Sequence, residues 1–343
     1  MNMPPTHDAE NSKCRGCDEP ITSKNDSEAH VIPNALGGRL KPKGIICRTC
    51  NTALDDLADN ALVRAFGAWP TLLDIPRDRG SNPSKAVTTR QGRRVRMDPD
   101  GTLTKTDVVY DVTPVESGHA VDIAAGDFKT FRQLLRRLQT QFPNFDPVAA
   151  ERQAQKVGLD DDDQLKLSLD VSPAAVMGGA ITAIWLFLIM KTGRTFMDWS
   201  TLQAVVRKMQ SSGGTFRYLT EGLPGLIGPD LPIGHKLIVR SVPKSGELIA
   251  YVEILGVLRL GGVFAKAPAP SILIEEIYVH DVWGRADVSG DFSIEAVAFE
   301  AQEWRNVGLG PDDVEAVQAH FKSRLEDVFV RHYRNRFPAS SSA

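Results

Sequence analysis

The chain has 343 residues, of which 42% are hydrophobic and 24% are charged, and its formal net charge is −3 at pH 7. This balance is typical of a soluble globular protein, and it excludes a global basic field that would by itself indicate a nucleic-acid partner. The length allows two or three domains. No signal peptide is visible, so we expect a cytoplasmic protein.

All four cysteines lie in two CxxC pairs, made of Cys14 with Cys17 and Cys47 with Cys50. A two-residue spacer lets both thiolates of a pair reach one ion, and two such pairs suit tetrahedral zinc. A redox dithiol is the alternative, but no thioredoxin-like βαβ pattern accompanies the pairs. Two disulfides would need an oxidising compartment. We therefore predict one structural Zn²⁺ held by the four cysteines.

Two further polar residues accompany the cysteine pairs: His30 lies between them and Asn51 follows the second directly. A neutral imidazole can take a proton from water near pH 7. A hard cation prefers oxygen ligands, and Asn51 offers a carbonyl oxygen. Phosphodiester hydrolysis needs a base for water and a cation near the phosphate oxygens. The alternatives are a histidine that only packs or caps a turn and an asparagine that only caps a helix.

Taken together, these residues resemble the HNH endonuclease family in its zinc-braced form. The matching elements occur in the family's order: CxxC, His-x-x-Pro at residues 30–33, the Gly37-Gly38 turn, and CxxC-Asn. The resemblance covers about residues 13–66. It implies a ββα-metal, treble-clef-like module in which His30 is the general base and Asn51 helps to hold a catalytic Mg²⁺ or Mn²⁺. The four cysteines fall at the family's structural zinc.

One position departs from the family's pattern. The family often has an acidic residue or histidine directly before the base, where this chain has Ala29. Glu28 is our candidate for the missing oxygen ligand, beside His30 and Asn51 at the catalytic cation, with Asp26 and Asp55 as alternatives. Ala29 also favours a second interpretation, in which the module is a catalytically inactive, zinc-braced binder of nucleic acid or protein.

Around the second cysteine pair, we predict that a strand ends at Ile46 and that a helix begins at Arg48, with a partial apolar stripe. His30 would then lie on the first strand and Asn51 at the start of the helix, facing each other. Gly37-Gly38 is typical of a hairpin turn that needs positive φ.

Residues 61–110 carry nine basic and five acidic residues, a net charge of +4. The basic excess centres on four arginines before a turn at residues 98–101: Arg90, Arg93, Arg94 and Arg96. We predict a β-hairpin with these arginines along its first arm. Because the planar guanidinium suits phosphate, the hairpin is a candidate contact for the DNA backbone. The alternative is a solvated hairpin face.

The remaining pattern predicts an α+β protein in three parts. These are an HNH-type module at 1–66, a connector with the basic hairpin at 67–125, and a larger mixed α+β domain at 126–343. The predicted elements are short strands within 89–123, an amphipathic helix at 127–140, a helix at 174–190, a meander of strands within 236–281, and helices at about 293–304 and 311–333. The uncharged 174–190 segment is marginal for a membrane span, so we expect a buried helix and no membrane.

The resulting functional prediction is a metal-dependent endonuclease that hydrolyses DNA phosphodiester bonds. The resemblance implies roles in restriction or defence against phage. The larger domain is expected to regulate or target the nuclease, and its pattern leaves several partners open. They are DNA, a second copy of the chain in a homo-oligomer, and a small-molecule or protein regulator of a ligand-gated nuclease.

Overall fold

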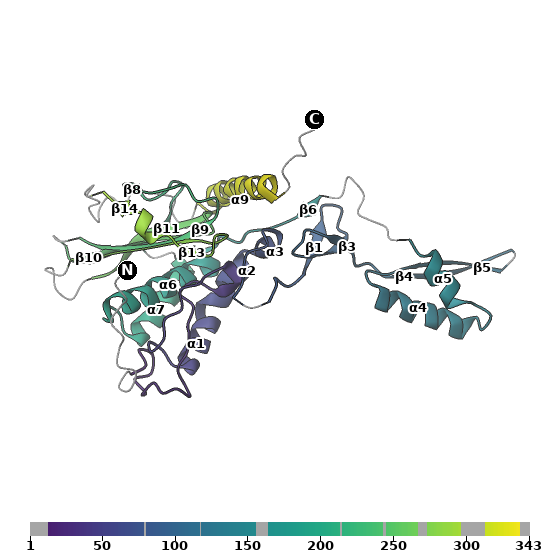
Figure 1. Cartoon of the computed structure of the whole chain (residues 1–343), viewed down its shortest axis with the longest axis horizontal. Coiled ribbons are helices and arrows are strands. Elements are labelled where there is room, and N and C mark those ends of the chain that lie inside the picture. The colour runs from purple at the N-terminus through teal and green to yellow at the C-terminus, as the bar shows by residue number, and fades with distance from the viewer. Residues whose placement is uncertain are drawn as a thin grey trace. The chain divides into compact units, whose positions relative to one another are not determined.

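The computed structural model describes residues 13–78, 80–116, 118–155, 164–212, 215–242, 245–266, 273–295 and 313–336. Contacts between Cα atoms group the chain into two compact units (Figure 1). The first joins the described residues up to Gly67 with Ile75–Gly80 and with the residues from Leu169 onward. The second contains Ala68–Asp74 and Ser81–Ser168. The predicted three-part division follows chain order instead, and its boundaries stay a prediction.

The cysteine-containing part of the first unit is largely irregular and ends in a helical segment. Its elements are the 3-10 helix η1 (Asn34–Leu36), α1 (Arg48–Leu54), the π-helical turn η2 (Asp55–Asp59) and α2 (Asn60–Ala65). The predicted helix start at Arg48 is confirmed. The strands predicted for His30 and Ile46 are wrong, because only isolated bridges form here, at Asp26–Cys47 and Lys13–Pro20.

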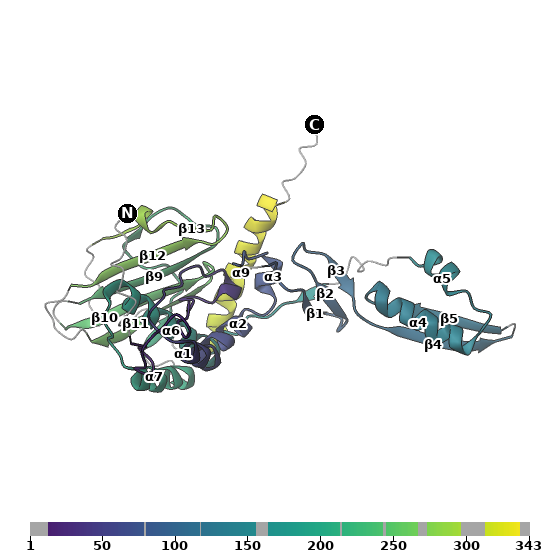
Figure 2. The same ribbon diagram turned by 60° about the horizontal axis from the view of Figure 1, so that its bottom comes forward.

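The larger part of the first unit is a six-stranded antiparallel sheet in the order β13-β12-β9-β10-β11-β7 (Figure 2). Its strands are β7 (Phe216–Tyr218), β9 (Gly234–Ser241), β10 (Glu247–Ile254), β11 (Leu258–Lys266), β12 (Glu275–Asp281) and β13 (Ala286–Asp287). The predicted meander is right for β9 to β11. It is wrong for β12, which pairs with β9 instead of β11. The largely buried β9 therefore has a partner strand on each edge, β10 and β12.

Within the predicted meander, a single strand is expected over 248–260, but a tight turn divides it into β10 and β11. Three residues, 255–257, separate the paired Ile254 and Leu258, and Leu255 and Gly256 have φ values of 55° and 69°, the positive angles that tight hairpin turns use. The turn directs β11 back along β10, so both strands enter the core of the sheet.

The uncharged segment forms α6 (Pro173–Thr192), a buried helix as predicted. It packs against α2, α7 (Trp199–Ser212) and one face of the sheet (Figure 1). A Cβ on Gly179 would lie 2.6 Å from Leu62, so a glycine is required where α6 meets α2. Among the described residues, α6 is also the one helix long and apolar enough to span a membrane, although most of it is buried within the protein.

On the other face of the sheet in Figure 1 lies α9 (Val314–Arg336), which confirms the helix predicted at 311–333. The smaller elements of this region are β8 (Leu226–Ile227), the 3-10 helix η3 (Ser289–Asp291) and β14 (Ser293–Ile294). The helix predicted at 293–304 is wrong at its start, where β14 pairs with β8. Its remainder, from residue 296, lies outside the described residues.

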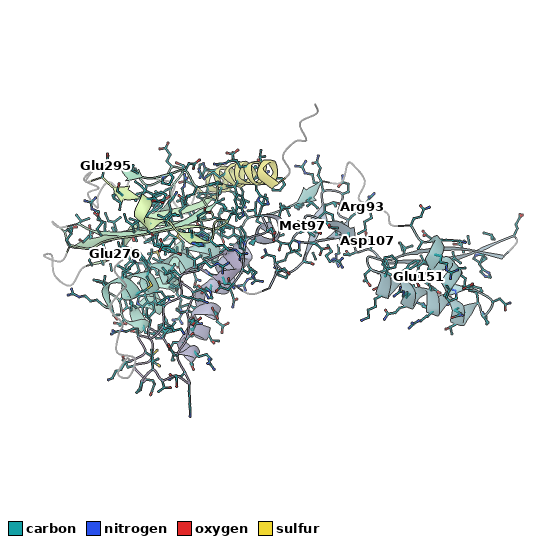
Figure 3. The ribbon with its side chains drawn as sticks, in the orientation of Figure 1. Arg93, Met97, Asp107, Glu151, Glu276 and Glu295 are labelled. Atoms are coloured by element: carbon teal, nitrogen blue, oxygen red, sulfur yellow. The ribbon has the colours of Figure 1, made fainter. Side chains whose placement is uncertain are left out.

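The second unit combines a small sheet with a helix-covered hairpin. Its elements are α3 (Trp69–Leu72), β1 (Lys85–Thr89), β2 (Arg94–Met97), β3 (Leu103–Lys105), β4 (Val109–Val115), β5 (Gly118–Ala124), α4 (Phe128–Gln141), α5 (Pro147–Gln153) and β6 (Leu165–Lys166). The sheet order is β3-β2-β1-β6, with a core of Val87, Val95 and Met97. Met97 is labelled in Figure 3. The predicted strands and the amphipathic helix α4, capped by the Asp127 carboxylate, are confirmed.

A buried histidine connects the large sheet to the segment that follows His30. His235 on β9 has its Nε2 2.9 Å from the carbonyl oxygen of Leu36, and its Nδ1 accepts the N–H of Leu255 at 3.2 Å. Nε2 therefore carries the proton and donates to Leu36. Burial first, and His280 second, lower the pKa of His235 from 6.5 to about 3, so its imidazole is neutral at pH 7.

We expect this histidine to make the protein acid-sensitive. Between pH 6.5 and about 3, the unfolded chain binds a proton that folded His235 excludes, so stability falls as the pH drops through this window. The contribution is about 1.4 kcal/mol per pH unit. Urea unfolding between pH 7 and 5 would measure it. His235→Gln should lose this slope, whereas substitution of the exposed His119 by Gln should keep it. An equal slope in all three proteins would contradict the assignment.

Candidate active site

The four cysteines come together as the sequence predicts. All four Sγ atoms lie within 4.8 Å of one another, and those of Cys17 and Cys47 are 3.7 Å apart. Tetrahedral zinc with Zn–S bonds of about 2.3 Å places its sulfurs about 3.8 Å apart. Cys14, Cys47 and Cys50 are buried and Cys17 is exposed. This closed set of sulfurs fits a structural metal ion, and sulfur-only ligation is typical of zinc.

The local backbone geometry of the first CxxC pair, which forms a turn called a knuckle, favours metal binding. The Sγ of Cys14 accepts the N–H groups of Gly16 at 3.3 Å and of Cys47 at 3.2 Å. A Cβ on Gly16 would lie 2.5 Å from the Sγ of Cys50, so the knuckle closes only with glycine here. The sequence therefore encodes both the ligands and the close approach of the two knuckles.

The thiols cannot all ionise without a compensating cation. Burial opposes ionisation of Cys14, but backbone N–H groups, that of Cys47 first, outweigh it and lower its pKa from 9.0 to about 7. Burial and then the neighbouring Cys14 raise the pKa of Cys50. A bound divalent cation would remove this conflict, because it stabilises thiolates directly.

His30 lies in an irregular segment and is half-buried. Its neighbour Val31 donates its N–H to the carbonyl oxygen of Leu40 at 2.8 Å, and η1 follows directly. Gly37 ends η1 with a φ of 86°, which confirms the positive φ predicted there, but the predicted hairpin turn is wrong because no strands flank this glycine. A Cβ on Gly38 would lie 1.8 Å from the carbonyl oxygen of Ile32, so this glycine serves a close approach of the backbone.

An aspartate that sequence reasoning missed contacts His30. The Oδ2 of Asp78 lies 3.1 Å from the Nε2 of His30. The same carboxylate pairs with Arg39 and, at 3.2 Å, with Lys41. The N–H of Asp78 donates to the Oδ1 of Asn34 at 2.9 Å, which fixes the backbone beside η1. No local sequence pattern could have predicted this contact, because 48 positions separate Asp78 from His30.

These contacts keep Asp78 ionised. Burial alone would raise its pKa, but hydrogen bonds from His30 and Lys41 and the charge of Arg39 lower it from 3.8 to about 2. The carboxylate is therefore a permanent acceptor at neutral pH. With Nε2–H donating to it, the Nδ1 of His30 retains its lone pair.

Asn51 lies in the first turns of α1 and is half-buried. The N–H of Asp55 donates to the carbonyl oxygen of Asn51, so these two side chains share one face of the helix. At Asp55 the helix changes to a π-turn, closed by the N–H of Asn60. Such turns are frequent at functional sites. Burial and then Asp56 raise the pKa of Asp55, whereas the nearby His30 lowers it.

The other acidic candidates already have partners. The two oxygens of Glu28 pair with Lys43 at 2.8 Å and Lys41 at 3.4 Å, and hydrogen bonds from these lysines, Lys43 first, lower the pKa of Glu28. The Oδ1 of Asp26 accepts the N–H groups of Ser27 and Gly44. The metal-ligand role predicted for Glu28 stays a prediction.

The four predicted arginines lie in the second unit. Arg90 and Arg93 flank the turn between β1 and β2, while Arg94 and Arg96 share one face of β2. Arg90, Arg93 and Arg94 are exposed, and the half-buried Arg96 pairs with Asp98 at 3.3 Å. The turn at 98–101 lies between β2 and β3, so the arginines line β2 and its preceding turn. Their contact with DNA stays a prediction.

Comparisons with known proteins identify one part of the chain. No curated protein and no solved structure matches the chain significantly. Residues 14–67 match the family model described as HNH endonuclease. This match spans both cysteine pairs, His30 and Asn51, and it ends at the last residue before the second unit. The chain therefore carries an HNH endonuclease module, with a cysteine tetrad that fits a structural metal ion, joined to a larger sheet-rich domain.

Proposed function

We propose that this protein is a divalent-metal-dependent endonuclease that hydrolyses DNA phosphodiester bonds, with His30 as general base. The observation that supports this most directly is the 3.1 Å contact between the Nε2 of His30 and Asp78. A carboxylate in this position fixes the tautomer and orientation of the imidazole. The Nδ1 of His30 then accepts a proton from the attacking water.

Asn51 and Asp55 are the residues that we assign to the catalytic cation. They share one helix face, and Asp55 lies within electrostatic reach of His30. An amide oxygen and a carboxylate are suitable ligands for Mg²⁺ or Mn²⁺, which keep several of their waters. Asp55 thus offers the oxygen that Ala29 lacks. When bound, the cation would neutralise charge that develops on the phosphate oxygens.

Basic residues beside His30 support a phosphate substrate. Arg39 and Lys41 pair with Asp78, and Lys43 extends from the same segment. Cations at this position would attract the DNA backbone and contribute to charge stabilisation in the transition state. In the second unit, the exposed Arg90, Arg93 and Arg94 are candidates for further contacts to the backbone.

Plasmid cleavage tests the proposal. Purified protein should nick or linearise supercoiled plasmid with added Mg²⁺ or Mn²⁺, and EDTA should stop the reaction. Parallel reactions with single-stranded DNA and with RNA would define the substrate. Tight plasmid binding without cleavage under any divalent cation would instead favour the inactive binding module.

The position of Asp78 predicts an effect on turnover. Asp78→Asn should lower kcat by about 10- to 100-fold with little change in KM, because the outer partner of a functional histidine orients it. Asp78→Glu, which keeps the carboxylate, should retain more activity. Asp291→Asn, at an exposed position, is the matched control and should leave the rate unchanged. A purely structural Asp78 would instead lower the folded fraction and leave kcat per folded molecule unchanged.

A further inference from the structure

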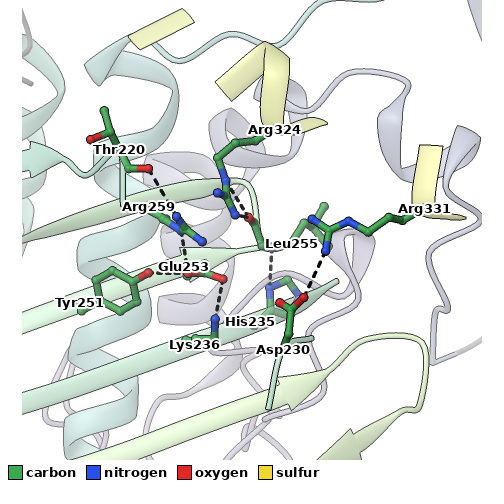
Figure 4. Close-up of polar contacts among 11 residues, drawn as sticks. Thr220, Asp230, His235, Lys236, Tyr251, Glu253, Leu255, Arg259, Arg324 and Arg331 are labelled. Atoms are coloured by element: carbon green, nitrogen blue, oxygen red, sulfur yellow. Dashed lines mark hydrogen bonds and ion pairs between the residues drawn. The ribbon is translucent and has the colours of Figure 1, made fainter. Parts of the chain in front are cut away.

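A charged cluster outside the HNH module lies at the β10–β11 hairpin of the large sheet. Its centre is Glu253, which is 2% exposed. The Glu253 carboxylate accepts Lys236 at 2.8 Å, Arg259 at 2.9 Å and the hydroxyl of Tyr251 (Figure 4). A single buried carboxylate thus already has two cationic partners.

A third cation reaches the same place from α9. Arg324 donates through Nη2 and Nε to the carbonyl oxygen of Gly256, at 2.6 and 3.2 Å (Figure 4). This carbonyl is neutral, and no acidic side chain among the described residues pairs with Arg324. Lys236, Arg259 and Arg324 therefore leave two positive charges uncompensated by Glu253. By contrast, Arg331 on the same helix pairs with Asp230 at 3.4 Å.

This excess positive charge is unfavourable in the free protein. The side chains of Lys236 and Arg259 are only 16% and 12% exposed. Burial first, and the like charge of Arg259 second, lower the pKa of Arg324. Cations in a region of low polarity repel one another strongly unless an anion accompanies them.

Hydrogen-bonding atoms also remain without partners here. The Nε2 of His320, on the same helix as Arg324, is buried and has no hydrogen-bond partner. Burial first, and then the charges of Arg324 and Arg259, lower the pKa of His320, while a hydrogen bond to the backbone of Thr220 raises it; the imidazole therefore lies among the cations. Within the described part of the chain, Arg324 donates through Nε and Nη2 to Gly256, which leaves Nη1 for a further acceptor. Excess charge and unused donors together are typical of oxyanion recognition.

The geometry points to a binding site for a small dianion of the phosphate class, formed by Arg324, Arg259 and His320 beside the β10–β11 hairpin. A charge of −2 would balance the cluster, and tetrahedral oxygens match guanidinium donors. The low exposure of Arg259 favours a small phosphate or phosphate ester over a duplex backbone, which stays at the protein surface. The site goes beyond nuclease activity, since it involves no residue of the HNH module.

Thermal unfolding of the full chain tests this site. The probes are inorganic phosphate and ribose 5-phosphate, each compared with chloride at equal ionic strength and without added divalent cations. Saturating ligand should raise the unfolding midpoint by about 5 °C. Arg324→Gln should weaken binding at least about tenfold, as expected for loss of a charge-assisted contact. Arg331→Gln, on the same helix, should bind as the wild type does.

His320→Gln provides a second variant in case Arg324→Gln fails to fold, and it should also weaken binding. A larger shift with the ester than with phosphate would identify a phosphorylated metabolite as the ligand. No shift in the wild type, or equal shifts in the Arg324 and Arg331 variants, would overturn the site. A shift that depends on Arg324 but occurs only with a short DNA duplex would overturn the assignment of a small anion. His30→Ala should show the same binding, so the outcome is independent of the proposed nuclease activity.

Discussion

His30→Ala is expected to lower the rate of metal-dependent DNA cleavage by about 10²- to 10⁴-fold, the usual contribution of general-base catalysis. The reason is local: the carboxylate of Asp78 lies 3.1 Å from the Nε2 of His30, which leaves Nδ1 as the proton acceptor in the mechanism that we propose. Alanine removes that acceptor and leaves the cysteine tetrad unchanged. Initial rates of supercoiled plasmid nicking at saturating Mg²⁺ would measure the loss.

The matched control for this variant is His119→Ala. His119 is exposed on β5, where its ring lies 4.7 Å from that of Phe142, and it should be dispensable for cleavage. Both variants should retain the structural metal at the wild-type ratio. Equal cleavage by His30→Ala and the wild type would exclude His30 from the mechanism and would favour another base.

Cys47→Ser is expected to have the largest effect on stability. Cys47 supplies one sulfur of the tetrad and also precedes α1, so loss of the metal would release both knuckles and the helix that carries Asn51. Structural zinc contributes about 10–16 kcal/mol in isolated zinc-finger peptides. We expect the metal content to fall from about one ion per chain to near zero. The unfolding midpoint should drop by about 10 °C or more.

Thr49→Ser is the control for this variant, since Thr49 is exposed between Cys47 and Cys50 and supplies no ligand. Metal content would be measured by elemental analysis and unfolding by calorimetry. A chelator added to the wild type should reproduce the loss of stability seen in Cys47→Ser. Retention of the metal and of the midpoint in Cys47→Ser would show that the tetrad does not hold the structural ion.

Local patterns predicted those features that short stretches of chain encode. The two CxxC spacers specify which sulfurs meet, and the structure brings all four together. The uncharged segment at 174–190 indicates a buried helix, because a helix without a polar face would expose apolar surface to water on every side unless the protein covers it. The spacing of apolar stretches likewise predicted that β9 pairs with the strand after it, but it missed the turn that separates β10 from β11. The local prediction failed for the segment around His30, where the expected strands are reduced to isolated bridges.

Contacts between distant segments were decided only by the tertiary structure. Asp78 meets His30 across 48 positions, and His235 meets Leu36 across 199. The charged partners of Glu253 come from neighbouring strands, and Arg324 reaches the same hairpin from α9. The sequence determined the cysteine tetrad and indicated the candidate base, because their signals are local. The sequence did not determine which residues orient or neutralise these groups. Packing and strand register create those contacts, and they produce no periodic pattern in the sequence.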